Sequence, residues 1–323
     1  MDRVREADLT QPITLRDVVA ARERIAPHVD RTPLLRSDPL GMWLKAEHLQ
    51  RTGSFKPRGI VNAVASLDAT ARARGLITMS AGNTAIALAY AAKTLGAHAT
   101  VVMPEAAPRS KIDATRQHGA EIVFHPDRVT LGDRLRQESE ARGALLVHPH
   151  EDAAVFAGHG TIALEILQDL PDVDLVVVPV GGGGLIAGIA VALTESRPRI
   201  RIVGVETRGA PTMRVALDAG EPRRLERIDT IADGLTAPIA GRAAFEIVRR
   251  RVADVVVIDD ADAIAGLRAL ASRTKQLVEP AGAVAVAALL SGAIPMARGE
   301  RVVAILSGGN VDLDRYASFL EGE

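Results

Sequence analysis

The sequence contains no cysteine. This absence excludes disulfide bonds, thiol nucleophiles and cysteine metal sites, and it fits a cytoplasmic protein. Lysine is also scarce, because only five of the 39 lysine and arginine residues are lysines. Arginine thus fills almost every position that needs only a positive charge. We therefore expect Lys56, in the stretch TGSFKPRG, to have a specific role that arginine cannot fill.

The chain has little charge imbalance. Its 39 basic and 40 acidic residues are interspersed and give a net charge of -1. Such a chain offers no basic face, so we expect no nucleic acid partner. At 323 residues, 47% of them hydrophobic, it is long enough for one large or two medium domains. The N-terminal stretch MDRVREADLTQPITLRD lacks the apolar core of an export signal.

One long uncharged stretch, LVVVPVGGGGLIAGIAVAL at residues 175–193, has about the length of a membrane span. A proline and four consecutive glycines at its centre are poor choices for a lone helix in lipid. We therefore interpret it as a strand, a turn and a helix, and expect no membrane association.

Hydrophobic periodicity indicates an α/β protein. Thr14 with Asp17 three residues later has capping-box spacing, so a helix is expected to start there. Between residues 57 and 148, amphipathic segments alternate with the short apolar runs LITMS, ATVVMP, AEIVFHP and ALLVHP, and the segments end at Gly75, Gly96, Gly119 and Gly143. Glycine is the usual left-handed stop of a helix, and the runs read as buried strands of a mainly parallel sheet.

The second half repeats this alternation with LVVVPV, IRIVGVE, DVVVID and RVVAILS. We predict two α/β domains. We expect residues 51–148 to form a small β/α domain, and residues 1–50 and 149–323 to form a large domain.

Unusual residues follow four of the predicted strands. SAGN at residues 80–83 follows LITM, GGGG follows LVVVPV, Glu206 closes IRIVGV, and SGGN at residues 307–310 follows RVVAIL. In open α/β sheets, ligands bind at the carboxyl ends of the strands, next to helix N-termini. A single site can gather all four segments.

Four successive glycines before a helix allow the backbone to wrap closely around an anion such as a phosphate. The alternative is a tight turn needed only for packing. A second alternative is the dinucleotide pattern G-x-G-x-x-A at Gly182, Gly184 and Ala187, with Glu206 as the ribose-binding acid of an NAD-dependent dehydrogenase. A Walker A loop is excluded because no lysine follows the glycines.

Pro57 suits the first turn of a helix, which places Lys56 at a helix N-terminus. There the helix dipole and partial burial disfavour the charged amine, which becomes nucleophilic near neutral pH. A Schiff-base cofactor needs such a lysine, and Phe55 beside it can pack against a flat ring. A solvated lysine before a helix is the competing interpretation.

Eight motifs occur together: LKAEHLQRTGSFKPRG, SAGNTAIALAYAAKTLG, VMPEAAPRSKIDATRQHGAEIV, GHGTIALEIL, VPVGGGGLIAG, TIADGL, EPAGAVAVAAL and LSGGNVDL. In this set and order the sequence resembles the threonine dehydratase and serine racemase family. These are pyridoxal-phosphate enzymes of the tryptophan-synthase-β fold (fold type II). The resemblance runs from about residue 14 to residue 315.

The resemblance implies that Lys56 binds pyridoxal 5'-phosphate covalently and is the catalytic base, while Phe55 and Asn83 contact the cofactor ring. It also implies that Gly181, Gly182, Gly183 and Gly184 hold the phosphate and that Ser307 faces the pyridine nitrogen. The substrate carboxylate would bind the loop formed by Ser80, Ala81, Gly82, Asn83 and Thr84. The family usually has histidine where this chain has Thr84.

The activity implied is that of a lyase, a threonine/serine ammonia-lyase (dehydratase), which converts L-threonine or L-serine to 2-oxobutanoate or pyruvate and ammonia. A serine racemase, or a dehydratase of a bulkier 3-hydroxy amino acid, is the alternative within the family. Serine racemases have a second serine at the position of Ala81, so we expect elimination to dominate. Outside the family, the alternatives are an NAD-dependent dehydrogenase and a small-molecule sensor. The sensor interpretation would give Lys56 no role. The resemblance also implies a homodimer or homotetramer acting in the cytoplasm on a small hydroxy amino acid.

We expect no metal site, although two groups of residues have features of one. Family members with a cation site use an acid, a backbone carbonyl and a second acid. Glu206 and Ala210 fit the first two positions, but Thr212 occupies the third. His148, His150 and His159 have close spacing that also suggests zinc. Finally, the chain ends soon after SGGNVDLDRYASFL, so we expect no C-terminal regulatory domain and no isoleucine inhibition through one.

Overall fold

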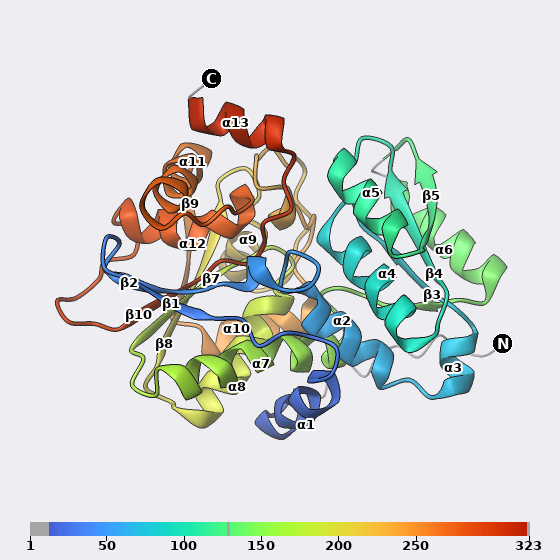
Figure 1. Cartoon of the computed structure of the whole chain (residues 1–323), viewed down its shortest axis with the longest axis horizontal. Helices are drawn as coiled ribbons and strands as arrows, with labels where there is room; N and C mark the ends of the chain where they lie inside the picture. The colour runs from blue at the N-terminus through green and yellow to red at the C-terminus, as the bar shows by residue number, and fades with distance from the viewer. Residues whose placement is uncertain (1–12, 128–129, 322–323) are drawn as a thin grey trace.

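The computed structural model describes residues 13–127 and 130–321 (Figure 1). The stretch in which we expect no export signal lies largely outside these residues. Two sheets organise the described part of the chain. A six-stranded sheet has the order β1-β2-β10-β7-β8-β9, and a four-stranded sheet has the order β5-β4-β3-β6. Apart from the antiparallel pair β1 and β2, the paired strands run parallel, which confirms the predicted α/β class.

The strands are β1 (Leu34–Ser37), β2 (Met42–Lys45), β3 (Leu76–Met79), β4 (Ala99–Pro104), β5 (Glu121–His125), β6 (Leu145–Leu146), β7 (Leu175–Pro179), β8 (Arg201–Thr207), β9 (Asp254–Ile258) and β10 (Val302–Ile305). The helices are α1 (Leu15–Ile25), α2 (Lys56–Ala65), α3 (Ala69–Ala73), α4 (Asn83–Leu95), α5 (Arg109–Gln117), α6 (Leu131–Arg142), α7 (Ala153–Asp169), α8 (Gly184–Ser196), α9 (Thr212–Ala219), α10 (Arg242–Arg251), α11 (Asp260–Ala269), α12 (Pro280–Leu290) and α13 (Leu313–Glu321). Short helical turns are η1 (Glu47–Leu49), η2 (Asp233–Leu235) and the π-helical turn η3 (Leu270–Thr274).

Helices cover both faces of the six-stranded sheet. Figure 1 shows α7, α8 and α10 on one face and α11 and α12 on the other, while α4, α5 and α6 surround the four-stranded sheet. Each face of the larger sheet has its own hydrophobic core, one containing residues of α7 and α8 and the other residues of α11 and α12. A further core lies between the smaller sheet, α2 and α4. Burial on both faces explains why the strands read as continuous apolar runs.

The helix start predicted at Thr14 and the helix ends predicted at four glycines are observed in the structure. The backbone N–H of Thr14 donates to Asp17 Oδ2 at 2.8 Å, and the N–H of Asp17 donates to Thr14 Oγ1, so the capping box exists. The four predicted stop glycines, which include Gly96 with φ +68°, all adopt positive φ. Local sequence chemistry therefore sets the start of α1 and the predicted helix ends.

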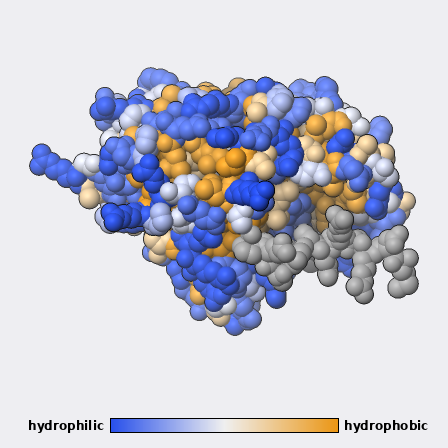
Figure 2. All heavy atoms as spheres, turned by 90° about the horizontal axis from the view of Figure 1, so that it is seen from below, coloured by the Kyte–Doolittle hydropathy of each residue, from blue (hydrophilic) through white to orange (hydrophobic). Residues whose placement is uncertain are grey.

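The uncharged stretch at residues 175–193 forms β7, a glycine turn and α8, as predicted. No described helix is long and apolar enough to cross a membrane. On the face shown in Figure 2, hydrophilic residues predominate and hydrophobic residues gather near the middle.

Candidate active site

Lys56 is the first residue of α2, and Pro57 follows it in the first helical turn. Its side chain is partly buried. Burial lowers the pKa of Lys56 from 10.5 to about 8, and the carboxylate of Glu279 opposes this shift. A lysine in this position is available as a neutral amine near physiological pH, as the sequence predicted.

Phe55 lies between Lys56 and a buried histidine. The Phe55 ring is 4.8 Å from Lys56 Nζ and 4.7 Å from the ring of His159, which it meets edge to face. His159 is fully buried, and its burial followed by the charge of Lys56 holds its pKa well below the ordinary value. The imidazole is thus a neutral packing group beneath Phe55.

The four glycines form the turn between β7 and α8, and Gly183 has φ +95°. The backbone N–H groups of Gly181, Gly182 and Gly183 donate to no described residue. Side chains would not fit here, since a Cβ on Gly183 would lie 2.7 Å from Met213 Cε. Unpaired N–H groups at the start of a 13-residue helix suit the phosphate of pyridoxal phosphate.

The predicted carboxylate loop joins β3 to α4. Ser80 Oγ accepts a hydrogen bond from the N–H of Gly82 at 3.0 Å, and Ala81 lies between them. Asn83 and Thr84 begin α4 and are buried. The loop therefore lies at a helix N-terminus, where a carboxylate is favoured.

The segment after β10 lies beside the segment that carries Lys56. Ser54 pairs with Gly308, and the N–H of Phe55 donates to the carbonyl of Ser307 at 3.0 Å. Ser307 Oγ donates to the Ala281 carbonyl at 3.3 Å. The structure thus brings Ser307 next to Phe55, although these residues are far apart in the sequence.

Asn83 is tied to the N-cap residue of α12 and to the segment that follows β10. Its Nδ2 donates to Glu279 Oε1 at 2.6 Å, and its Oδ1 accepts from Asn310 Nδ2 at 2.9 Å. One N–H of the Asn83 amide is thus donated to Glu279, and the second donates to no residue in the described part of the chain.

Glu206, the candidate acid at the end of β8, binds the first turn of a neighbouring helix. Its carboxylate accepts the N–H groups of Met213 at 2.7 Å and Arg214 at 2.8 Å, both in the first turn of α9. Burial raises the pKa of Glu206 to about 8, and these N–H groups oppose the shift. Each oxygen of Glu206 therefore accepts one N–H of α9, and this fixes α9 against the end of β8.

The cation candidates are also engaged within the chain. The Ala210 carbonyl accepts from the N–H of Thr212 at 2.9 Å, and Thr212 Oγ1 donates to the Ala237 carbonyl. Among the described residues, no three His, Cys, Asp or Glu side chains form a metal-binding group, and this covers the three histidines of the region 148–159.

Sequence reasoning missed a buried charged cluster beside the site. Lys111 Nζ donates to Asp233 Oδ2 at 2.9 Å and to Glu279 Oε2 at 3.1 Å. It also lies next to Gly82, where a built Cβ would be 3.3 Å from Nζ. The rarity of lysine was the available signal, since it applies to Lys111 as well as to Lys56.

A second missed cluster anchors α2 two residues after Lys56. The buried guanidinium of Arg58 donates to both oxygens of Glu47 and both oxygens of Glu165, over distances of 2.7 to 3.0 Å. Lys45 Nζ donates to Glu165 Oε2 as well. This cluster joins β2, η1, α2 and α7, and therefore fixes the first turn of α2.

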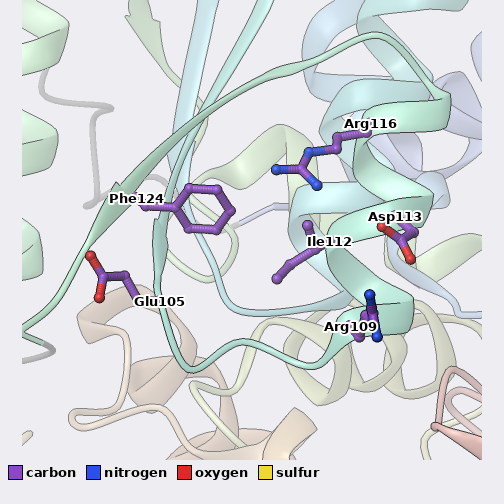
Figure 3. Close-up of a pocket in the computed structure, with 6 residues that line it drawn as sticks. All are labelled: Glu105, Arg109, Ile112, Asp113, Arg116 and Phe124. Atoms are coloured by element: carbon purple, nitrogen blue, oxygen red, sulfur yellow. The ribbon is translucent and has the colours of Figure 1, made fainter.

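A pocket of about 480 Å³ lies elsewhere, between α5 and β5 (Figure 3). It contains none of the predicted site residues. Its lining residues are Glu105, Arg109, Ile112, Asp113, Arg116 and Phe124.

Comparisons with known proteins identify the family of this chain. The model of the family described as pyridoxal-phosphate dependent enzyme matches residues 25–308. The chain is 44% identical over 317 residues to an L-threonine ammonia-lyase of Geobacter sulfurreducens, covering 96% of this chain and 78% of that protein. It is 40% identical to the catabolic L-threonine dehydratase of Escherichia coli K12, covering 95% of each.

The structure of maize serine racemase superimposes with a TM-score of 0.90 at 34% identity, covering 97% of this chain and 98% of that one. The resemblance stated from the motifs is therefore confirmed. The chain belongs to the family of pyridoxal-phosphate-dependent enzymes.

Proposed function

We propose that this enzyme is a threonine/serine ammonia-lyase, which eliminates water from L-threonine or L-serine and releases 2-oxobutanoate or pyruvate with ammonia. The observation that carries this proposal is the position of Lys56. Its amine has a pKa of about 8 and lies 4.8 Å from the centre of the Phe55 ring. It is also close enough to His150, beside the glycine loop, for its charge to add to the effect of burial in lowering the pKa of that imidazole. Relatives named threonine ammonia-lyase and dehydratase supply the substrate class.

Lys56 has two tasks in this proposal. Its neutral amine would hold pyridoxal phosphate, and the same amine, when free, would take the Cα proton of the substrate. Pyridoxal phosphate supplies an electron sink for the negative charge that develops at Cα. The Arg58 cluster keeps the start of α2, and so Lys56, in place during both tasks.

The loop of residues 80–84 orients the substrate. We propose that its backbone N–H groups, at the N-terminus of α4, bind the substrate carboxylate. Thr84, where the family usually has histidine, is buried.

Ser307 sets the strength of the electron sink. We propose that its hydroxyl faces the pyridine nitrogen, since Ser307 is buried next to Phe55. A hydroxyl does not keep that nitrogen protonated as a carboxylate would. With Ser307 in this place the bound group would be a weaker electron sink, which would favour early loss of the β-hydroxyl group.

Mass spectrometry and product analysis together test the proposal. Borohydride treatment of the purified protein should abolish its visible absorption band and attach the cofactor to the peptide containing Lys56. L-Threonine should yield 2-oxobutanoate and ammonia in equal amounts. A labelled Lys56 with no oxo acid formed from L-threonine, L-serine or a bulkier 3-hydroxy amino acid would reject the ammonia-lyase function.

Serine racemisation is the second candidate, because the chain is also similar to the maize serine racemase. Racemisation needs a proton donor on each face of the planar carbon, and Lys56 serves only one. Ala81 has no proton to give at the position where the serine racemases have a second serine. Elimination is therefore the main reaction.

We also propose that the two sheets mark two domains, with boundaries near residues 51 and 148. We propose further that the enzyme is cytoplasmic and forms a homodimer or homotetramer. This assembly is implied by the resemblance to the threonine dehydratase and serine racemase family. Light scattering coupled to size exclusion chromatography tests the assembly, and a monomer would reject it.

A further inference from the structure

His150 lies directly against the glycine loop. A Cβ built on Gly182 would be 2.4 Å from Cγ of His150 and 2.8 Å from its Nδ1. No side chain fits at position 182, because the imidazole occupies that space. His148 supports the ring from the side, with ring centres 4.6 Å apart and an interplanar angle of 78°.

The backbone around His150 is fixed on both sides of the loop. The N–H of His150 donates to Nδ1 of His148 at 3.4 Å, and Glu151 Oε1 accepts from the N–H of Arg242 at 2.9 Å. The carbonyl of Gly182 accepts from the N–H of Gly241 at 3.0 Å. The ring and the glycine loop are therefore held in one arrangement.

The ring nitrogens of His150 are unpaired within the described part of the chain, and the side chain is only partly buried. An imidazole carries an N–H donor in both its neutral and its protonated state. The N–H groups of Gly181, Gly182 and Gly183 are unpaired at the same place. Unpaired donors from a side chain and from the backbone thus adjoin one another.

An anion with several acceptor oxygens matches this arrangement. Two arginines of neighbouring segments do not compete for it, since Arg58 is committed to Glu47 and Glu165 and Arg242 is exposed. We propose that His150 binds the cofactor phosphate through a ring N–H, adding a side-chain donor to those of the glycine loop. This inference rests on the cofactor of the proposed function.

Cofactor affinity tests the role of His150 independently of turnover. The full chain, stripped of cofactor, is titrated with pyridoxal phosphate and with pyridoxal, which lacks the phosphate. His150→Leu keeps the bulk and removes the donor, so its affinity for pyridoxal phosphate should fall about tenfold to a hundredfold. His150→Asn keeps an N–H donor and should bind within about threefold of the parent. Both variants should bind pyridoxal as the parent does.

Parental affinity of His150→Leu for pyridoxal phosphate would overturn the proposal, and so would equal losses for both ligands. If His150→Leu does not fold, NMR spectra of the parent labelled with ¹⁵N-histidine test the contact between His150 and the phosphate. The His150 nitrogen signals should shift on adding pyridoxal phosphate but not pyridoxal, and unchanged signals would overturn the role. Loss of oxo-acid formation with these shifts intact would count against the proposed function alone.

Discussion

Lys111 Nζ lies 3.1 Å from Oε2 of Glu279, and both side chains are only 2% exposed. Lys111 belongs to α5 beside the four-stranded sheet, whereas Glu279 precedes α12 on the six-stranded sheet. The pair therefore joins the two parts of the molecule beside the loop of residues 80–84. Asn83 donates to the other oxygen of Glu279, so the same carboxylate also holds that loop's helix.

Lys111→Met should destabilise the fold. Removing the cation leaves Glu279 buried beside the partly exposed Asp233 without compensation, which costs about 3–5 kcal/mol of unfolding free energy. Urea denaturation measures the loss. Lys93→Met removes an exposed lysine of α4 and is the matched control, with an expected change below about 0.5 kcal/mol. Equal stability of the two variants would show that the ion pair contributes nothing.

The reactivity of Lys56 should follow its lowered pKa. Since only the neutral amine attacks an aldehyde, the rate at which the cofactor-free enzyme reacts with pyridoxal should rise with pH and reach half its maximum near pH 8. The growth of the visible band between pH 6 and pH 10 measures this rate, with Lys56→Ala as the blank. A midpoint near 10.5, the value of an exposed lysine, would contradict the burial of the amine.

Ala81→Ser should shift the reaction with L-serine toward racemisation. The new hydroxyl supplies a proton donor in the loop where the parent has a methyl group. Chiral chromatography of the products should show little D-serine beside pyruvate for the parent and a larger D-serine share for the variant. D-Serine accumulating as fast as pyruvate in the parent would instead favour a racemase.

Glu206→Ala should lower stability without creating or removing nucleotide binding. The N–H groups of Met213 and Arg214 would lose their partner in a buried place, at a cost of about 1–3 kcal/mol. Denaturation of this variant and of Glu221→Ala, an exposed control, measures the cost. Adding the parent or either variant to NADH should leave the fluorescence of NADH unchanged. Tight NADH binding by the parent would revive the dehydrogenase alternative.

Local patterns sufficed for much of the fold. Alternation of apolar runs and glycine-terminated helices predicted the parallel strands, and Pro57 predicted that Lys56 begins a helix. These signals act over a few residues, because caps, stops and strand burial depend on neighbouring positions.

The charged partners of the site were not predictable in the same way. Asn83 and Glu279 are 196 positions apart, and Arg58 and Glu165 are 107 apart, so no spacing connects them. Their pairing depends on how the two sheets dock. Lysine scarcity was nevertheless informative, since Lys45 and Lys111 are buried in ion pairs and Lys56 is partly buried at the site, while Lys93 and Lys275 are exposed.

The most direct test of the proposed function is the formation of 2-oxobutanoate from L-threonine by the cofactor-loaded enzyme and by its Lys56→Ala variant. The parent should release 2-oxobutanoate and ammonia in equal amounts. Lys56→Ala, which lacks both the cofactor attachment and the base, should lose at least about a thousandfold in kcat while keeping the parental fold by circular dichroism. Turnover by Lys56→Ala near the parental rate would contradict the central assignment.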